Sequence, residues 1–191
     1  MTKSPHDPFP VLSEAAEILV VEDETVARRE MSRFLKRKGF RVREASGAVE
    51  AIQRAAEGNI AVVLMDIVLG EGPDGIEVAR EIQSVHPDTS VIFVSAYASD
   101  RGYRERADLD QIRIVGWIEK PIGTRTIHQL TELISGEIIK TAVRASLARA
   151  RAQGIAPAEH LRALAKQNPS LTRGLLQDIL AELGLPEQKP E

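Results

Sequence analysis

Three apolar runs in this chain end abruptly in charged residues. Asp66 follows the run 60–65, the pair Glu22–Asp23 follows the run 18–21, and Lys120 follows a later run. Parallel strands that are buried on both faces have continuous apolar sequences, and their carboxyl ends meet at one edge of the sheet, where α/β folds place their functional groups. The sequence therefore predicts three carboxylates and one ammonium group together at one edge of a parallel sheet.

Apolar runs alternate with amphipathic segments over the first two thirds of the chain. The expected strands are 18–21, 40–44, 60–65, 91–94 and 112–118, with helices between them. We expect Thr25 to cap the first helix, and Val26 and Val49 to face inward. Such alternation predicts βαβ units, and five of them most often form a flavodoxin-like α/β fold with strand order 2-1-3-4-5. The functional crevice would then lie beside strands one and three.

Composition narrows the class of protein. A content of 43% hydrophobic and 28% charged residues is typical of a globular chain, and the absence of cysteine excludes disulfides and thiolate chemistry. No apolar run approaches the roughly 20 residues of a membrane span, and the N-terminus lacks a signal-peptide core, so we expect a cytoplasmic protein without a membrane partner. A net charge of -3 argues against a protein that coats nucleic acid over its whole surface.

Three regions are expected along the chain. Residues 1–16 contain Pro5, Pro8 and Pro10 and are interpreted as a flexible leader, 17–135 as the α/β domain, and 136–191 as an extended helix followed by short helices. The helical pattern that begins at Thr124 runs to about Gln153, and further helices are expected from Pro157 and over 171–183. Their apolar stripes require packing on each other, on the domain or on a second copy.

The residue types at the expected sheet edge suit phosphoryl chemistry. Mg²⁺ prefers oxygen ligands, and Asp23 and Asp66 can supply carboxylates. A carboxylate can attack phosphorus to form an aspartyl phosphate, while Lys120 offsets charge on the phosphoryl oxygens. The hydroxyl of Ser95, at the end of the fourth expected strand, could hydrogen-bond such an oxygen.

Four short motifs together resemble the receiver domain of bacterial two-component response regulators. They are the acidic pair in 18–24, the strand ending at Asp66, the pair Ser95–Ala96 and the pair Lys120–Pro121. Their spacings of 43, 29 and 25 residues are similar to those of the family. Each motif alone is common, but the four in order are specific, and the resemblance covers about 18–135.

The resemblance implies that Asp66 accepts a phosphoryl group from a sensor histidine kinase or a phosphotransfer protein, with Mg²⁺ as cofactor. Asp23 would bind the metal directly, Glu22 through water, and the backbone carbonyl of Val68 would complete the protein ligands alongside Asp66. Ser95 and Trp117 match the family's switch pair. The resemblance implies no enzyme beyond self-catalysed phosphotransfer and dephosphorylation.

Several positions depart from the commonest family pattern. Glu22 stands where Asp is more frequent, and Trp117 is larger than the usual Tyr or Phe. Val68 and Tyr97, each two residues beyond a site residue, flank the expected site. Because a bulky apolar side chain and an aromatic ring there could exclude water, we predict slow autodephosphorylation.

The sequence leaves alternatives for the role of the C-terminal region and for the class of protein. Residues 140–185 hold seven basic and three acidic side chains, and their helix-break-helix pattern resembles a helix-turn-helix. The last helix is mostly leucine, however, with few side chains that read bases, so we favour a tail for homodimerisation or protein interaction over nucleic-acid binding. A Mg²⁺-dependent phosphatase of the haloacid dehalogenase type would need a second Asp where Val68 stands.

Overall fold

The computed structural model describes residues 16–167, 177 and 179–181. The strands are β1 (Glu17–Val21), β2 (Val42–Ala45), β3 (Ile60–Met65), β4 (Ser90–Ser95) and β5 (Ile114–Glu119). The helices are α1 (Thr25–Arg37), α2 (Ala48–Glu57), α3 (Gly75–Val85), α4 (Arg101–Leu109), α5 (Thr124–Ala152) and α6 (Pro157–Gln167).

The five strands form one parallel sheet in the order β2-β1-β3-β4-β5, which confirms the predicted flavodoxin-like topology. All residues of β1, β3 and β4 are buried, as their continuous apolar sequences predicted. In the register of the sheet, Val21 lies opposite Ala45 on one side and Met65 on the other. The residues that follow these strands therefore emerge at the same edge.

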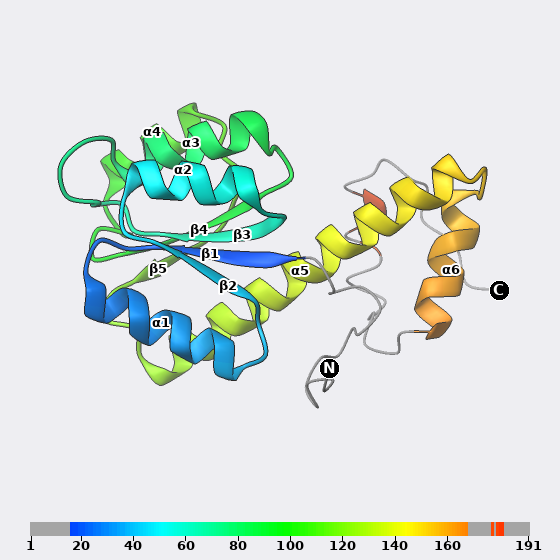
Figure 1. The fold of residues 1–191 in the computed structure, drawn as a ribbon, viewed down its shortest axis with the longest axis horizontal. Helices are drawn as coiled ribbons and strands as arrows, with labels where there is room; N and C mark the ends of the chain where they lie inside the picture. Colours follow the sequence, from blue (N-terminus) through cyan, green and yellow to red (C-terminus); the bar gives the residue numbers. More distant parts are fainter. Residues whose placement is uncertain (1–15, 168–176, 178, 182–191) are drawn as a thin grey trace.

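Helices cover both faces of the sheet (Figure 1). Alternate strand residues point to opposite faces. Leu19, Val63 and Phe93 therefore join the core under α2 and α3, whereas the neighbouring Ile18 and Ile92 join the core under α1 and α5. The sheet is thus the middle layer of three, and its carboxyl edge lies between the two helical layers.

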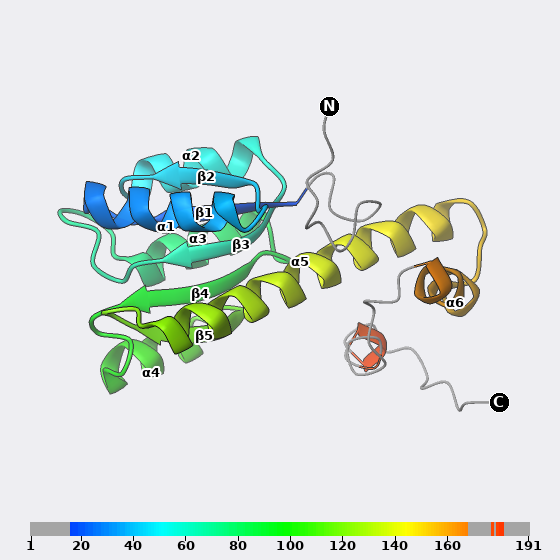
Figure 2. The ribbon, with the colours of Figure 1, turned by 90° about the horizontal axis from the view of Figure 1, so that it is seen from below.

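Helix α5 is 29 residues long and extends beyond the sheet (Figure 2). Its C-terminal half contributes to a separate apolar cluster made of Ile139, Ala142, Val143, Leu147, Leu161, Leu164, Ile179 and Leu180. Because Leu161 and Leu164 belong to α6, the expected packing of the tail helices on each other is observed for α5 and α6. Of the leader expected over 1–16, residues 1–15 lie outside the described residues, whereas Ala16 is described and buried. Most of the helix expected over 171–183 also lies outside the described residues.

A buried carboxylate fastens α5 to the sheet before the helix leaves it. Glu137 accepts a hydrogen bond of 2.5 Å from the hydroxyl of Ser90, the first residue of β4. The ammonium of Lys140 lies 3.0 Å from the other carboxylate oxygen. The guanidinium of Arg113 lies 3.7 Å from the oxygen that Ser90 contacts. The buried charge is therefore paired on both sides, which a carboxylate in this position requires.

Some local predictions were wrong. Val26 and Val49 were expected to face inward, but they are 61% and 71% exposed. Both valines lie in the first turns of their helices, whereas the buried apolar residues of α1 and α2 come later in each helix, at Leu35, Ala51 and Ala55. Thr25 does not cap α1, because the N-cap position is Glu24, whose side chain makes no capping hydrogen bond. The strands expected to begin at residues 40 and 112 begin at Val42 and Ile114.

Among the described helices, none is both long and apolar enough to cross a bilayer.

Candidate functional site

Backbone hydrogen bonds bring the charged strand ends together. The N–H of Asp66 donates to the carbonyl of Val21 at 3.0 Å, which joins the end of β3 to the end of β1. The N–H of Lys120 donates to the carbonyl of Ser95 at 3.1 Å, which joins the end of β5 to the end of β4. The residues that the sequence places after three separate strands therefore share one edge.

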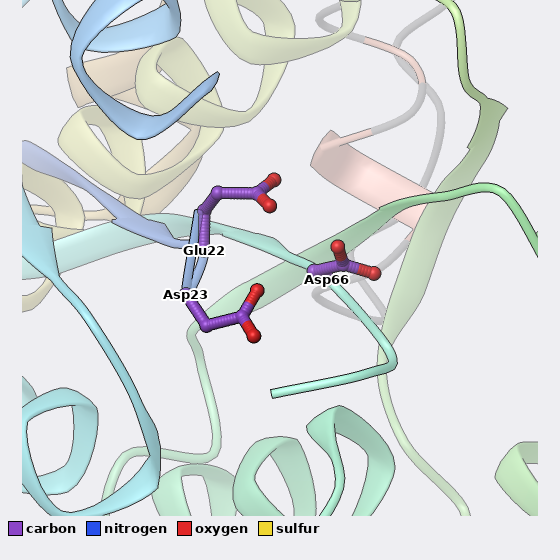
Figure 3. A group of neighbouring side chains, drawn as sticks. All are labelled: Glu22, Asp23 and Asp66. Atoms are coloured by element: carbon purple, nitrogen blue, oxygen red, sulfur yellow. The ribbon is translucent and has the colours of Figure 1, made fainter. Parts of the chain in front are cut away.

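Three carboxylates gather at this edge (Figure 3). Glu22 and Asp23 come from the end of β1 and Asp66 from the end of β3, and each offers an oxygen within 4.8 Å of the other two. Glu22 and Asp66 are buried, each with 8% of its surface exposed, whereas Asp23 is exposed. The cluster is therefore open to solvent on the side of Asp23.

Lys120 neutralises the buried pair of carboxylates. Its ammonium nitrogen lies 2.5 Å from an oxygen of Asp66 and 2.5 Å from an oxygen of Glu22. Burial alone would lower the pKa of Lys120, but the hydrogen bonds to Asp66 and Glu22 outweigh burial and raise that pKa. Burial also raises the pKa of Glu22, and the hydrogen bond from Lys120 offsets this only in part. Lys120 is therefore charged at neutral pH.

The donor set of this cluster fits Mg²⁺. The ion requires hard oxygen ligands and usually takes one or two carboxylates from the protein while keeping several waters. Glu22, Asp23 and Asp66 supply only oxygen, and the exposed side of Asp23 leaves room for water. Two of the three negative charges already face a cation, Lys120, so the site is built to hold positive charge.

The loop after Asp66 turns back on its carboxylate. The N–H of Val68 donates to Oδ1 of Asp66 at 3.3 Å, so the backbone of Val68 lies beside the expected acceptor. Val68 is 42% exposed. Tyr97, the other expected flanking residue, is 52% exposed, and its ring lies 6.2 Å from that of Tyr103.

The expected switch pair occupies two neighbouring strands. Ser95, the last residue of β4, is buried, and its hydroxyl oxygen accepts a hydrogen bond of 3.4 Å from the N–H of Tyr97. Trp117 of β5 is half-buried and stacks on Phe93 with ring centroids 4.6 Å apart. The guanidinium of Arg104, on α4, lies 5.0 Å from the same indole ring. Trp117 therefore packs on the side of the sheet that carries α4.

Sequence reasoning missed two residues that shape the site. Arg28 of α1 donates hydrogen bonds to the carbonyls of Glu22 at 2.6 Å and Asp23 at 3.1 Å, and so fixes the backbone of the acidic pair. No sequence signal marks this contact, because it depends on how the first turn of α1 is oriented. Asp74 is the N-cap of α3 in a capping box with Glu77. The spacing of these two acids before an apolar helix is a signal that could have predicted it.

A groove of about 860 Å³ adjoins the acid cluster. Glu22, Asp66 and Lys120 line one part of it, and the remainder runs between α1 and the start of α5, lined by apolar and charged side chains that include Met31, Phe34, Arg37, Ile122 and Ile127. The buried carboxylates are thus accessible from a surface that is large enough to hold part of another molecule.

Comparisons with known proteins agree with this architecture. A family model for the response regulator receiver domain matches residues 18–132. The sensor kinase CckA of Brucella abortus (strain 2308) is 36% identical over 118 residues, which are 61% of this chain and 12% of CckA. The transcriptional regulatory protein SrrA of Staphylococcus aureus is 32% identical over 139 residues, which are 71% of this chain and 54% of SrrA. The chain thus spans about half of SrrA and far less of CckA.

A solved structure gives the same result for the fold. The response regulator protein TrrA of Thermotoga maritima, in complex with Mg²⁺ and BeF, aligns with a TM-score of 0.52 at 28% identity and covers 62% of this chain and 98% of TrrA. Magnesium and phosphorylation are typical of the family. Because the family model covers more than half of the chain, this chain belongs to the receiver-domain response regulators of bacterial two-component systems.

Proposed function

We propose that Asp66 is the phosphoacceptor and that it receives its phosphoryl group from a phosphohistidine of a sensor histidine kinase or phosphotransfer protein. The observation that carries this proposal is the contact of Lys120 with Asp66, beside two further carboxylates from β1. A buried nucleophilic carboxylate that is already paired with a cation is prepared for a reaction that adds negative charge to it.

The transfer exchanges one bond to phosphorus for another. A carboxylate oxygen of Asp66 attacks the phosphorus, and the new P–O bond forms while the P–N bond of the phosphohistidine breaks. The electron pair of the P–N bond stays on the imidazole nitrogen, which then takes a proton. Lys120 stays within reach of Asp66 throughout and offsets the charge on the phosphoryl oxygens.

Mg²⁺ would be held by Asp23 and Asp66 directly, by Glu22 through water, and by the backbone carbonyl of Val68. When bound, the ion offsets negative charge on the phosphoryl oxygens. Arg28 supports this arrangement, because its hydrogen bonds to the carbonyls of Glu22 and Asp23 fix the turn from which both acids project.

Ser95 and Trp117 form the proposed switch. A phosphoryl oxygen at Asp66 would attract the hydroxyl of Ser95, which at present accepts a hydrogen bond from Tyr97. Movement of Ser95 would alter the loop that leads to α4 and the packing of α4 around Trp117. The expected result is a changed surface over α4, β5 and α5, as in other charge-driven switches.

The groove beside α1 is the proposed contact surface for the phosphodonor. It reaches Glu22, Asp66 and Lys120, so a histidine presented there would be close to the acceptor. Its apolar side chains from α1 and the start of α5 could bury a helix of the donor protein. This partner assignment agrees with the general association of receiver domains with histidine kinases or phosphotransfer proteins.

For the output, we favour a C-terminal tail that forms a homodimer or binds another protein. The second half of α5 and α6 share an apolar cluster, which supports a separate helical unit. Nucleic-acid binding is the second candidate, because Arg149, Arg151 and Lys166 of this unit are exposed. Light scattering of the full chain tests the dimer, and a salt-sensitive mobility shift with random DNA would reverse the preference.

A phosphatase that turns over small phosphoesters is not favoured. The position for its general acid holds Val68, which cannot transfer a proton. Receiver-domain proteins are generally signal transducers rather than enzymes. Release of phosphate from small phosphoesters at many turnovers per protein would contradict our preference.

Intact mass measurement tests the acceptor. Incubation with acetyl phosphate and Mg²⁺ should add the mass of one phosphoryl group to the wild-type chain and none to Asp66→Asn. Asp88→Asn, at an exposed acid outside the cluster, is a matched control that should still be modified. Modification of Asp66→Asn to the same extent as wild type would reject Asp66 as the acceptor.

A further inference from the structure

Helix α4 buries little apolar surface, and charged groups tie it to α3. Among the residues of α4, only Ala107 is buried. Arg106 forms an ion pair with Asp74, the N-cap of α3, and Asp110, which follows α4, lies 3.7 Å from Arg80 near the middle of α3. Because the apolar contribution to docking is small, the position of α4 depends strongly on these polar contacts.

Asp74 performs two structural roles with one carboxylate. Its Oδ1 atom accepts hydrogen bonds from the N–H groups of Ile76 at 3.0 Å and Glu77 at 3.1 Å, which starts α3. The guanidinium of Arg106 donates to both oxygens of the same carboxylate. Charge-assisted contacts of this kind are stronger and more directional than neutral ones. Asp74 therefore joins the beginning of α3 to the side of α4.

The other side of Asp74 reaches the backbone of the proposed phosphoacceptor. Gly75, its neighbour, donates its N–H to the carbonyl of Ile67 at 2.8 Å. A Cβ atom on Gly75 would lie only 2.0 Å from the carbonyl oxygen of Asp66, so the two backbones are in direct contact. A short series of contacts thus leads from Asp66 through Gly75 and Asp74 to Arg106.

The docked position of Arg106 also carries an unfavourable contribution. Its Nε atom is buried and has no hydrogen-bond partner within the part of the chain that the structure describes. A buried donor without a partner disfavours the docked arrangement, because release of α4 would return this group to water. This unpaired donor therefore opposes the contribution that the ion pair makes to the docking of α4.

We propose that Arg106 is a positioning residue for the phosphoacceptor loop, and that its ion pair with Asp74 holds α4 in place and restrains its response to phosphorylation. This inference rests on the proposed role of Asp66. Ser95 begins the loop that leads to α4, so attraction of Ser95 toward a phosphoryl group pulls on α4. The ion pair opposes that movement, and by linkage its loss favours the phosphorylated arrangement.

The test compares Arg106→Gln and Asp74→Asn with wild type. Asparagine keeps an oxygen that can cap α3 but removes the charge that Arg106 requires. The matched control is Arg101→Gln, an exposed arginine on α4 for which the described residues show no ion pair. Mg²⁺ and beryllofluoride, which mimics a phosphoryl group on a carboxylate, are titrated while the fluorescence of Trp117 is recorded. Trp117 is the single tryptophan of the chain and lies beside Arg104 of α4.

Both variants should reach half-saturation at about two- to fivefold lower beryllofluoride concentration than wild type, as expected for loss of a partly exposed ion pair that opposes binding. Arg101→Gln should match wild type. Without beryllofluoride, hydrogen exchange of the α4 amides should be faster in both variants than in Arg101→Gln. A merely structural role of the pair would speed exchange without shifting half-saturation.

Unchanged half-saturation in both variants overturns the inference, and so does a shift to higher concentration, because the pair would then favour the bound arrangement. The inference is also overturned if the α4 amides of both variants exchange no faster than those of Arg101→Gln. If wild type itself does not respond to Mg²⁺ and beryllofluoride, the proposed function fails first. The exchange experiment then still decides whether the ion pair holds α4.

Discussion

The ammonium nitrogen of Lys120 lies 2.5 Å from Oδ2 of Asp66, although 54 positions of sequence separate the two residues. The same nitrogen contacts Glu22 at the same distance, so one cation joins the ends of β1, β3 and β5. Because both carboxylates are buried, their mutual repulsion would be large without this cation. The stability of the acid cluster therefore depends on Lys120.

Replacement of Lys120 by Gln should leave two buried carboxylates facing each other. We expect the free energy of unfolding in the absence of divalent cations to fall by about 1–3 kcal/mol. The loss is of this size because the carboxylates of Glu22 and Asp66 are buried, whereas Lys120 is partly exposed. Mg²⁺ should raise the urea midpoint of this variant more than that of wild type, since the ion replaces the lost positive charge. Urea denaturation with and without Mg²⁺ measures both effects.

Lys36→Gln is the matched control for that experiment. Lys36 lies 3.0 Å from Glu44 in an exposed ion pair outside the acid cluster. Its loss should cost at most about 1 kcal/mol and should not depend on Mg²⁺. Equal losses for the two lysine variants, with equal responses to Mg²⁺, would contradict the role assigned to Lys120.

Gly75→Ala should displace the loop that carries Asp66. The new Cβ atom would lie 2.0 Å from the carbonyl oxygen of Asp66, a contact that only a backbone shift can relieve. We expect a loss of about 2–3 kcal/mol in stability, in the range of overpacked interiors, together with slower phosphorylation by acetyl phosphate. Gly136 lies on α5, and a Cβ atom added there would meet nothing within 4 Å. Gly136→Ala should therefore be neutral or stabilising by up to about 1 kcal/mol. Similar effects of the two substitutions would be inconsistent with this account.

Val68 and Tyr97 should slow the loss of the phosphoryl group from Asp66. Both residues are exposed and follow Asp66 and Ser95 by two positions, and we expect their bulky side chains to limit the approach of water. We expect the phosphoprotein to persist for minutes, and Val68→Asn to shorten its lifetime about tenfold, which corresponds to roughly 1.4 kcal/mol of activation free energy. The decay of radiolabel from purified phosphoprotein measures this lifetime. Decay of the wild-type label within seconds would show that Val68 and Tyr97 do not shield Asp66 from water.

Glu50 should make a pH-dependent contribution to stability. Its carboxylate accepts hydrogen bonds of 2.9 Å from the N–H and the hydroxyl of Ser46, and the backbone hydrogen bond lowers its pKa below the ordinary value of 4.5. A carboxyl group whose pKa is lower in the folded state stabilises the fold above its unfolded pKa, and this contribution is lost as the pH falls through the folded pKa.

Wild type should therefore be more stable than Glu50→Gln at about pH 7, by up to about 0.5 kcal/mol because the side chain is partly exposed. The difference should shrink as the pH falls below 4.5 and vanish once the pH lies below the folded pKa of Glu50, according to the same linkage. Glu30→Gln, at an exposed glutamate of α1, controls for general charge effects. A difference that persists undiminished in acid would show that the charge of Glu50 is not responsible.

Much of the sheet and of the acid cluster could be predicted from the sequence. Continuous apolar runs such as 60–65 can be buried on both faces only in a parallel sheet, and a charged residue directly after such a run must emerge at its edge. The positions of Glu22, Asp66 and Lys120 at the ends of such runs are therefore sufficient to predict that they lie together. The helix that begins at Pro157 and the extension of α5 followed from apolar periodicity in the same way.

The tertiary structure alone decided how the helices meet one another. Three findings depend on where each helix lies along the sheet and how it is rotated. Arg106 reaches Asp74, and Arg28 binds the carbonyls of the acidic pair. Val26 and Val49 are exposed. Apolar periodicity specifies which face of a helix is buried, but not its neighbours or the turn at which its burial begins. The sequence therefore determined the chemistry at the strand ends, whereas three-dimensional packing determined the contacts between α4 and the loop that carries Asp66.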